Sequence, residues 1–508
     1  MMRLLLVVAL ALAVDASAPA GPAALENQRM ADLGDGRYQN PILGGDYPDP
    51  SVVRVGSDYY VTHSSFMYVP GLLIWHSRDL VNWRPVCNAL NEHVGSVYAP
   101  DLVLHEGTWY IYFPAGGTNW VVTAPAPEGP WSDPVDLQVG KIDPGHVVGP
   151  DGARYLHLSD GDVVQLAPDG LSVVGEKRHV YDGWRYPESW VVEGFCLESP
   201  KLTFHRGWYY LTSAEGGTAG PATSHMVVSA RSRGPIGPWE NSPHNPIVHT
   251  GSRDERWWSR GHGSLVDTPD GRWYIMYHGY ERGYLTLGRQ TLLEPIEWTD
   301  DDWFRGCPGL DVACPVAKPP GNAVPHGLAL SDDFASEELG LQWRFYAEED
   351  PAARYRVGDG VLGLRCKGES PADSSPVLCI PVNHSYEADV LVTVPEGAEA
   401  GLIVFYGPDC YAGVGLGGGR IFHLRRGARS SAAPLDSSSV WLRLRNEHHE
   451  LSLYYSPNGR TWTKMEKGIE TSGYHHNVFG GFVSLRLGLY AAGAGEVTFS
   501  SFRYRGLD

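Results

Sequence analysis

The segment Ser51-VVRVGSDYYVT-His63 decides the fold of the first 320 residues, because its pattern recurs four more times along the chain. An apolar strand, a turn containing Gly, Asp or Asn, and an aromatic strand follow one another, which is the pattern of a β-hairpin. The other copies are Asp101-LVLHEGTWYIY-Phe113, Gly149-PDGARYLHL-Ser159, Pro200-KLTFHRGWYYLT-Ser213 and Ser264-LVDTPDGRWYIMY-His278. One tyrosine of each copy marks the repeat: Tyr60, Tyr110, Tyr155, Tyr210 and Tyr274. Successive tyrosines of this set are 50, 45, 55 and 64 residues apart, a spacing that indicates one repeat unit per copy.

A second phrase follows three of these hairpins and ends in tryptophan each time. It reads IWHSRDLVNW up to Trp83, VVTAPAPEGPW up to Trp131 and MVVSARSRGPIGPW up to Trp239. Two hairpins per repeat make a four-stranded unit, so five units predict an all-β chain that begins with a five-bladed β-propeller at residues 38–320. A series of β-sandwiches could share this turn chemistry, but it gives no reason for five hairpins at this spacing.

A second domain is expected after the propeller. The stretch Cys314-PVAKPPGNAVPH-Gly327 is rich in Pro and Gly, which indicates a linker at residues 321–327. Short alternating strands then predict a β-sandwich at residues 328–508, namely Tyr386–Val394, Gly401–Tyr406, Val440–Glu447, Glu450–Tyr455 and Val497–Tyr504. We expect this sandwich to have a mainly structural role, packed against the propeller, with room for one loop to reach the mouth of a pocket.

The N-terminal residues have the pattern of a secretory signal peptide. Arg3 precedes the apolar run from Leu4 to Val14, and Ala16-Ser17-Ala18 offers a small-residue cleavage site. A signal peptide at residues 1–18 predicts a secreted protein, extracellular or periplasmic, with an extension at residues 19–37; a disordered or buried segment is the alternative. Eleven apolar residues are too few to span a bilayer.

Composition restricts the partners further. Forty Lys and Arg against 59 Asp and Glu give a net charge of −19, which argues against nucleic acid or an anionic membrane as partner and favours a neutral ligand. The seven cysteines include no CxxC pair and no zinc spacing; Cys307 and Cys314 are the nearest candidates for a disulfide. The oligomeric state is left open.

Three acidic residues precede hairpins of different repeats. Asp49 lies in Gly45-DYPDP-Ser51, Asp143 in Gly140-KIDP-Gly145 and Glu198 in Cys196-LESPK-Leu202. Each is followed by a proline, directly or after one residue, and proline favours extended backbone before it. Because equivalent strands of a propeller surround one axis, we expect the three carboxylates to converge there. A turn or strand cap would be the ordinary interpretation of a single Asp-Pro pair.

Two carboxylates on either side of a sugar are what cleavage of a glycosidic bond requires. One must be protonated to assist the leaving oxygen, while the other activates water or attacks carbon. A third acid close to the proton donor could raise its pKa by like-charge repulsion. Asp101 begins the second repeat and is a fourth acid at this rim, with ligand contact and strand capping as equal alternatives.

These motifs resemble glycoside hydrolase family 43, the β-xylosidase and α-L-arabinofuranosidase family. The resemblance rests on Asn40-PILGGDYPDPSVVRVGSDYYVTHSS-Phe66, on IDP at 142–144, on Glu198-SPKLTFHRGWYYLTSAEG-Gly217 and on Gly288-RQTLLEPIE-Trp298. It implies an inverting hydrolase with Asp49 as general base, Asp143 as modulator of pKa and orientation, and Glu198 as general acid. It also implies a substrate contact by Arg289 and a concanavalin-like C-terminal module. The family's usual EGP is replaced here by Glu198-Ser-Pro, and a second EG pair occurs at Glu193-Gly194.

Further side chains could border the space at the propeller axis where the three carboxylates are expected. Phe66, Tyr68 and Trp120 follow aromatic strands, where their rings could stack on a sugar or belong to the blade core. His262, in Arg260-GHG-Ser264, is a structural histidine by ordinary expectation, whereas the resemblance implies that it holds water or a calcium ion near the axis. No cofactor is expected to be required.

The sequence thus predicts a secreted glycosidase that releases terminal xylosyl or arabinosyl units, with inversion, from plant cell-wall polysaccharides or oligosaccharides. An exo-acting galactosidase of the same fold is one alternative, because these sugars differ only in hydroxyl orientation and the C5 substituent. A carbohydrate-binding propeller without catalysis, in which the acids only hydrogen-bond sugar hydroxyls, is the other.

Overall fold

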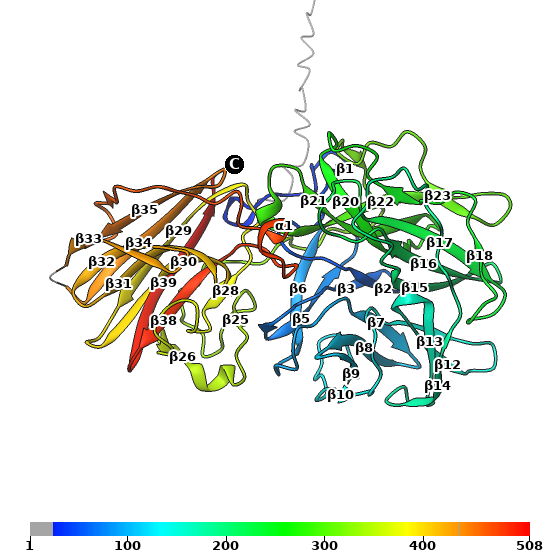
Figure 1. Ribbon diagram of the computed structural model, residues 1–508, viewed down its shortest axis with the longest axis horizontal. Helices are drawn as coiled ribbons and strands as arrows, with labels where there is room; N and C mark the ends of the chain where they lie inside the picture. Colours follow the sequence, from blue (N-terminus) through cyan, green and yellow to red (C-terminus); the bar gives the residue numbers. More distant parts are fainter. Residues whose placement is uncertain (1–23, 436) are drawn as a thin grey trace, which may run out of the picture.

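The structure is a computed structural model that describes residues 24–435 and 437–508. The expected signal peptide therefore lies outside the described residues. In the described residues, four four-stranded sheets and one five-stranded sheet form the first domain, and two eight-stranded sheets form the second. Figure 1 shows these two domains side by side. The all-β prediction, with a five-bladed propeller before a β-sandwich, is confirmed.

Four of the predicted hairpins form the first two strands of a blade, whereas the predicted range 149–159 contains only the second strand of the third blade, whose first strand ends at Val148. The first blade contains β2 (Ser51–Val55), β3 (Asp58–Thr62), β5 (Gly71–Ser77) and β6 (Trp83–Leu90), and the second contains β7 (Asp101–His105), β8 (Thr108–Ala115), β9 (Thr118–Ala124) and β10 (Val135–Asp136). The third contains β11 (Gly145–Val148), β12 (Arg154–Leu158), β13 (Asp162–Leu166) and β14 (Val173–His179), and the fourth contains β15 (Glu198–His205), β16 (Trp208–Glu215), β17 (Met226–Ser232) and β18 (Glu240–Asn241), with β19 (Val248–His249) beside β17. The fifth contains β20 (Trp257–Asp267), β21 (Trp273–Glu281), β22 (Arg289–Trp298) and β23 (Phe304–Gly306).

Burial explains why the second hairpin strand is apolar in every repeat. Strands β8 and β16 are buried along nearly their whole length, because each blade is covered by a neighbour on both faces. The peripheral strand β14 is exposed over most of its length and carries polar residues. Outside the blades, β1 (Arg37–Tyr38) pairs with β24 (Val316–Ala317), which brings the beginning and the end of the propeller segment together.

The C-terminal domain is a sandwich of two eight-stranded sheets. One sheet contains, in spatial order, β33 (Ala428–Pro434), β32 (Arg420–Arg425), β31 (Cys410–Gly417), β30 (Ala398–Gly407), β38 (Arg486–Gly493), β28 (Val377–Cys379), β25 (Arg344–Tyr346) and β4 (Tyr68–Val69). The other contains β26 (Tyr355–Gly358), β27 (Val361–Arg365), β39 (Glu496–Gly506), β29 (Ser385–Thr393), β34 (Ser439–Glu447), β35 (Glu450–Ser456) and β36 (Thr463–Lys464), with β37 (Ile469–Glu470) beside β35. The helical segments are short: η1 (Leu25–Asn27), η2 (Ser159–Gly161), η3 (Leu285–Leu287), η4 (Pro351–Arg354) and α1 (His476–Phe479).

Strand β4 joins the two domains. It lies in the sequence of the first blade, yet it pairs with β25, with Val69 opposite Phe345 and Tyr68 opposite Tyr346. Phe66 and Tyr68 accordingly belong to the buried core of the sandwich. The propeller therefore contributes both a strand and core side chains to the second domain.

The structure also bears on the cysteines and on membranes. All seven cysteines are free, so the nearest candidates, Cys307 and Cys314, are not paired here. None of the helices in the described ranges is long and apolar enough to cross a bilayer.

Candidate functional site

A pocket of about 140 Å³ opens at the propeller axis. Three of its lining residues are the acids singled out from the repeats, Asp49, Asp143 and Glu198. The expected site residues Arg289 and His262 also line it, and the remaining lining residues are Tyr98, Ala99, Ile142, Thr218 and Phe482. The convergence follows from topology: Asp49 and Asp143 lie two residues before β2 and β11, Glu198 begins β15, and these are the first strands of three blades.

The backbone at these residues differs from the sequence-based expectation. Asp49 and Asp143 precede prolines, for which extended backbone was expected, but their φ angles are +59° and +58°. His262 has a φ of +64°. Aspartate and histidine tolerate this left-handed region better than most residues, and such backbone concentrates at functional sites. The turn before each proline therefore sets the direction of the carboxylate through a strained conformation.

Close packing between blades brings Asp143 near Glu198. A Cβ atom at Gly145 would lie 1.5 Å from the carbonyl oxygen of Pro200, so only glycine allows the starts of β11 and β15 to approach this closely. The backbone nitrogen of Ser199 donates to Oδ2 of Asp143 at 3.1 Å. Gly145, which directly follows the IDP motif at 142–144, is thus the residue that lets the two strands approach each other.

Asp49 is buried among cationic and hydrogen-bonding partners. Nη1 of Arg289 donates to its Oδ1 at 2.9 Å, and Ser64 Oγ donates to its Oδ2. Nδ1 of His262 lies 3.3 Å from the same Oδ1. Burial alone would raise the pKa of Asp49, but the nearby Arg289, His262 and His278 hold this pKa well below its usual range. Asp49 is therefore ionised at neutral pH.

Glu198 and Asp143 are shifted in the opposite direction. Burial, followed by the charges of Asp143 and Asp49, raises the pKa of Glu198 well above its usual value. Burial and the charge of Asp49 raise the pKa of Asp143 to about 7. The pocket thus places a protonated carboxyl group and an ionised carboxylate around one space, which is the requirement for acid and base assistance at a single bond.

Histidines surround the acids but do not make a calcium site. Within residues 24–435 and 437–508, two sets of side chains have ligand atoms within 4.8 Å of one another, Asp49 with His262 and His278, and Glu198 with His225 and His262. Calcium prefers six to eight oxygen ligands, whereas imidazole nitrogens predominate here. The guanidinium of Arg289 already contacts the Asp49 carboxylate and would repel a cation. The donor set does not fit calcium, and the chemistry proposed below uses no metal.

One wall of the pocket comes from the sandwich domain. Phe482 follows helix α1, which Figure 1 shows between the two domains. Its ring stacks on His476 at 4.2 Å and lies 5.7 Å from the guanidinium carbon of Arg289. The loop is fastened to the propeller by reciprocal hydrogen bonds between Asn477 and Gly220. A loop of the second domain therefore does reach the pocket.

Four other residues expected at the site lie outside this pocket. Asp101 is buried and forms an ion pair with Lys201 at 2.8 Å. The indole nitrogen of Trp120 donates to Ala115 O, and its ring packs against the core of the second blade. Phe66 and Tyr68 are covered by the sandwich, because β4 carries this part of the first blade into the interface.

The sequence reasoning missed five pocket residues, Tyr98, Ala99, Ile142, Thr218 and Phe482. Ile142 directly precedes Asp143, and Tyr98 and Ala99 precede β7, so position within the repeat could have indicated these three. Phe482 carried no such signal, because it lies far along the chain in a domain with its own fold.

Comparisons with known proteins match both domains of the chain to family models. A family model described as Glycosyl hydrolases family 43 matches residues 38–304. A second model, Beta xylosidase C-terminal Concanavalin A-like domain, matches residues 331–505.

Individual relatives cover most of the chain. The non-reducing end alpha-L-arabinofuranosidase BoGH43B of Bacteroides ovatus is 30% identical over 526 residues, which span 93% of this chain and 95% of that protein. A xylan 1,3-beta-xylosidase of Vibrio sp. is 35% identical over 60% of this chain and 64% of its own length. The crystal structure of the GH43 protein BlXynB from Bacillus licheniformis has a TM-score of 0.83 at 28% identity, over 93% of this chain and all of that one.

Proposed function

The chain belongs to glycosyl hydrolase family 43 and is a glycosidase, and from this premise we propose that it releases terminal xylosyl or arabinosyl units from plant cell-wall polysaccharides or oligosaccharides with inversion of configuration. The observation that carries the proposal is the pairing of opposite protonation states in one pocket. Glu198 is held protonated and Asp49 ionised, while Asp143 lies between these extremes.

Pocket size and the relatives support removal of a terminal sugar. A volume of about 140 Å³ is well below the roughly 300 Å³ at which pockets for drug-sized ligands begin, and suits one sugar ring. Relatives named as an α-L-arabinofuranosidase and a β-xylosidase act on pentosides. Phe482 and Tyr98 offer aromatic surface to such a ring.

In the proposed reaction, each acid has one task. Glu198 donates its proton to the leaving glycosidic oxygen, and Asp49 deprotonates a water that attacks the anomeric carbon from the opposite face. Arg289 holds Asp49 in place and faces the sugar pocket. Asp143 keeps Glu198 protonated by its negative charge and orients the following backbone through Ser199 N.

The first experiment is a substrate screen. The purified protein is assayed on aryl β-D-xyloside, α-L-arabinofuranoside and β-D-galactoside, beside xylan and arabinan. We expect turnover of a pentoside. Preference for the galactoside would favour the galactosidase, and no turnover of any substrate would favour a binding propeller.

The first prediction concerns the leaving group. Glu198→Gln should reduce kcat/KM about 10²- to 10⁴-fold on unactivated xylo- or arabino-oligosaccharides, and far less on dinitrophenyl glycosides, which need little protonation. Asp49→Asn should abolish both, because the attacking water then has no base. Equal losses on both substrate types for Glu198→Gln would remove it from the role of general acid.

The stereochemical outcome tests the role of Asp49 directly. Proton NMR of the first-formed sugar should show the anomer opposite to that of the substrate. A product that retains the substrate's configuration would indicate a covalent intermediate and would overturn the assignment of Asp49 as base.

We also propose export from the cell. Its support is the charged start, apolar run and small-residue site of residues 1–18. N-terminal sequencing of the protein recovered from the medium or periplasm should begin near Pro19; an uncleaved intracellular product would contradict it.

A further inference from the structure

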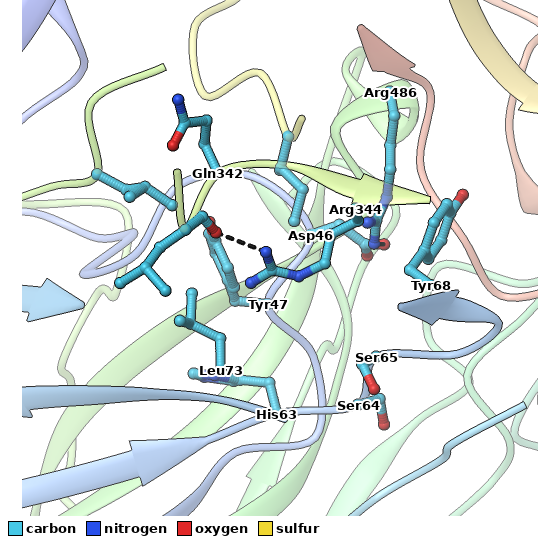
Figure 2. A pocket seen from close by; sticks show the side chains of 13 residues that line it. Asp46, Tyr47, His63, Ser64, Ser65, Tyr68, Leu73, Gln342, Arg344 and Arg486 are labelled. Carbon is cyan, nitrogen blue, oxygen red and sulfur yellow. Dashed lines mark hydrogen bonds and ion pairs between the residues drawn. The ribbon is translucent and has the colours of Figure 1, made fainter. Parts of the chain in front are cut away.

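A small cavity lined by charged, polar and apolar side chains lies where the sandwich meets the propeller, separate from the sugar pocket. Its volume is about 40 Å³, enough for two or three water-sized particles and too small for a sugar. The propeller contributes Asp46, Tyr47, His63, Ser65 and Tyr68, and the sandwich contributes Arg344 and Arg486 (Figure 2). All seven residues are buried or nearly so.

The charges around the cavity do not balance. Figure 2 shows Arg486 pointing at Asp46, and the nearest distance between their charged atoms is 3.7 Å. Arg344 donates only to neutral acceptors, the carbonyl oxygens of Leu341 and Trp343 and Oδ1 of Asn88. One guanidinium charge therefore lacks a carboxylate partner among the described residues. An unpaired buried charge is strongly unfavourable.

Several buried polar atoms of the lining also lack hydrogen-bond partners in the part of the chain that the structure describes, and the hydroxyls among them can either donate or accept. The Oγ of Ser65, the hydroxyl of Tyr68 and Nε of Arg486 are buried and lack partners among the described residues. Asp46 Oδ2 and His63 Nδ1 are the unpartnered acceptors of the lining. His63 Nε2 donates to Thr291 Oγ1, because that hydroxyl gives its own proton to Tyr47 O; His63 Nδ1 is thus an acceptor suited to water. The excess positive charge of Arg344 and Arg486 over Asp46 therefore favours an anion in the cavity.

The titration properties agree with this arrangement. Burial and the neighbouring Arg486 lower the pKa of Arg344 to about 10, so it is still charged at neutral pH. Burial raises the pKa of Asp46 despite the arginines nearby. Because a raised pKa disfavours the ionised carboxylate, Asp46 is less able to neutralise the positive charge of the two arginines.

We propose that this cavity binds a small monoanion of the halide class, chloride under natural conditions, together with water at His63. The bound anion neutralises the guanidinium pair and fastens the sandwich to the propeller. Asp46 also accepts a hydrogen bond from the backbone nitrogen of Arg289, so the site lies directly behind the residue that holds Asp49. The ligand thus supports the domain contact that positions the pocket.

The test compares thermal unfolding of the full chain in sodium chloride and in sodium gluconate at equal ionic strength. Gluconate is too large for the cavity. We expect a midpoint higher by about 2 °C or more in chloride, with saturation as chloride is titrated. In Arg344→Met this dependence should vanish, while the control Arg460→Met, at an exposed residue of the sandwich, should keep it.

A second measurement needs no variant. Crystals of the wild-type protein are grown or soaked in sodium bromide, and the anomalous signal is examined. A bromide peak between Arg344 and Arg486 would support the proposal. Equal midpoints in both salts, a dependence that survives in Arg344→Met, or water alone in the bromide crystal would overturn it.

Discussion

At the scale of single residues, the negative charge of Asp143 is the feature that tunes the proposed acid. Burial of Glu198 and the charge of Asp143 raise the pKa of Glu198. A general acid is active below its pKa, so activity is lost as the pH rises through that value. Asp143→Asn removes the charge, lowers the pKa of Glu198 and should move the alkaline limb of kcat/KM to lower pH by about one unit.

The acidic limb serves as the internal control for this prediction. It depends on ionisation of Asp49, whose pKa is held low chiefly by Arg289 and His262 against the effect of burial. We therefore expect the acidic limb of Asp143→Asn to move much less than the alkaline limb. An alkaline limb that stays in place, or moves to higher pH, would show that Asp143 does not act on Glu198 through its charge.

Ser199 is the residue at which the chain departs from the usual family sequence after the acid. Its φ is +57°, a region that glycine adopts without strain, and the resemblance places glycine at this position. The buried hydroxyl of Ser199 also lacks a partner among the described residues. Ser199→Gly stabilises the folded state because it relieves about 1 kcal/mol of backbone strain and removes the cost of an unpaired hydroxyl. The added chain entropy of glycine in the unfolded state opposes this gain by roughly 0.5–1 kcal/mol.

We expect Ser199→Gly to raise the free energy of unfolding by about 1 kcal/mol, measured by urea unfolding. Activity should be unchanged, because the Ser199 backbone nitrogen still donates to Asp143. Ser199→Ala removes only the hydroxyl and is the matched control. If the glycine variant is less stable than the alanine variant, strain at this residue is not relieved.

Individual site residues could be predicted where the repeat gave them a position or, for Arg289, where the family resemblance did. Asp49, Asp143 and Glu198 converge because three blades place their first strands around one axis. Asp101 has an equivalent position, but Lys201 from another blade pairs with it, and no spacing within the chain could indicate that partner.

At the scale of elements, the loop from α1 to Phe482 decides how the pocket is closed. Phe482→Ala should lower kcat/KM by about 10-fold, chiefly through KM, since it removes aromatic surface from the sugar pocket without changing an acid. Val478→Ala changes an exposed residue of the same loop and should behave as wild type. Steady-state kinetics on the preferred aryl glycoside makes the comparison. A loss confined to kcat, with KM unchanged, would indicate that the ring does not bind the sugar.

The elements themselves were largely readable from the sequence. Four of the five hairpins and the five sandwich strands named from alternation form, because tight turns and local side-chain alternation are properties of adjacent residues. For the third hairpin the prediction begins one residue after the first strand, β11, has ended. Strand β4 was not foreseen. Two residues give no periodic signal, and their partner β25 lies more than 270 residues away, so only the assembled sheet shows the pairing.

At the scale of the whole molecule, the two domains share one folded structure. Strand β4 extends a sandwich sheet, and Phe66 and Tyr68 complete the sandwich core from the propeller side. Arg29 of the N-terminal extension and His384 of the sandwich both contact Glu281 of the fifth blade. Glu281 is buried and its two partners are partly buried, so separating the domains would expose apolar surface and leave charges unpaired.

The last prediction follows from this coupling. The full chain should unfold in one calorimetric transition, because the sandwich core includes Phe66 and Tyr68 of the propeller segment and is incomplete without them. In a chain ending at Gly327, Phe66 and Tyr68 would become exposed, so the stability of the fold should fall more than the intrinsic affinity for the sugar. The wall of the pocket formed by Phe482 would also be absent. Phe482→Ala in the full chain is the control, since it opens the pocket without removing the domain. Two separate transitions, or a truncated protein that is well folded and fully active, would show that the sandwich is dispensable for the propeller.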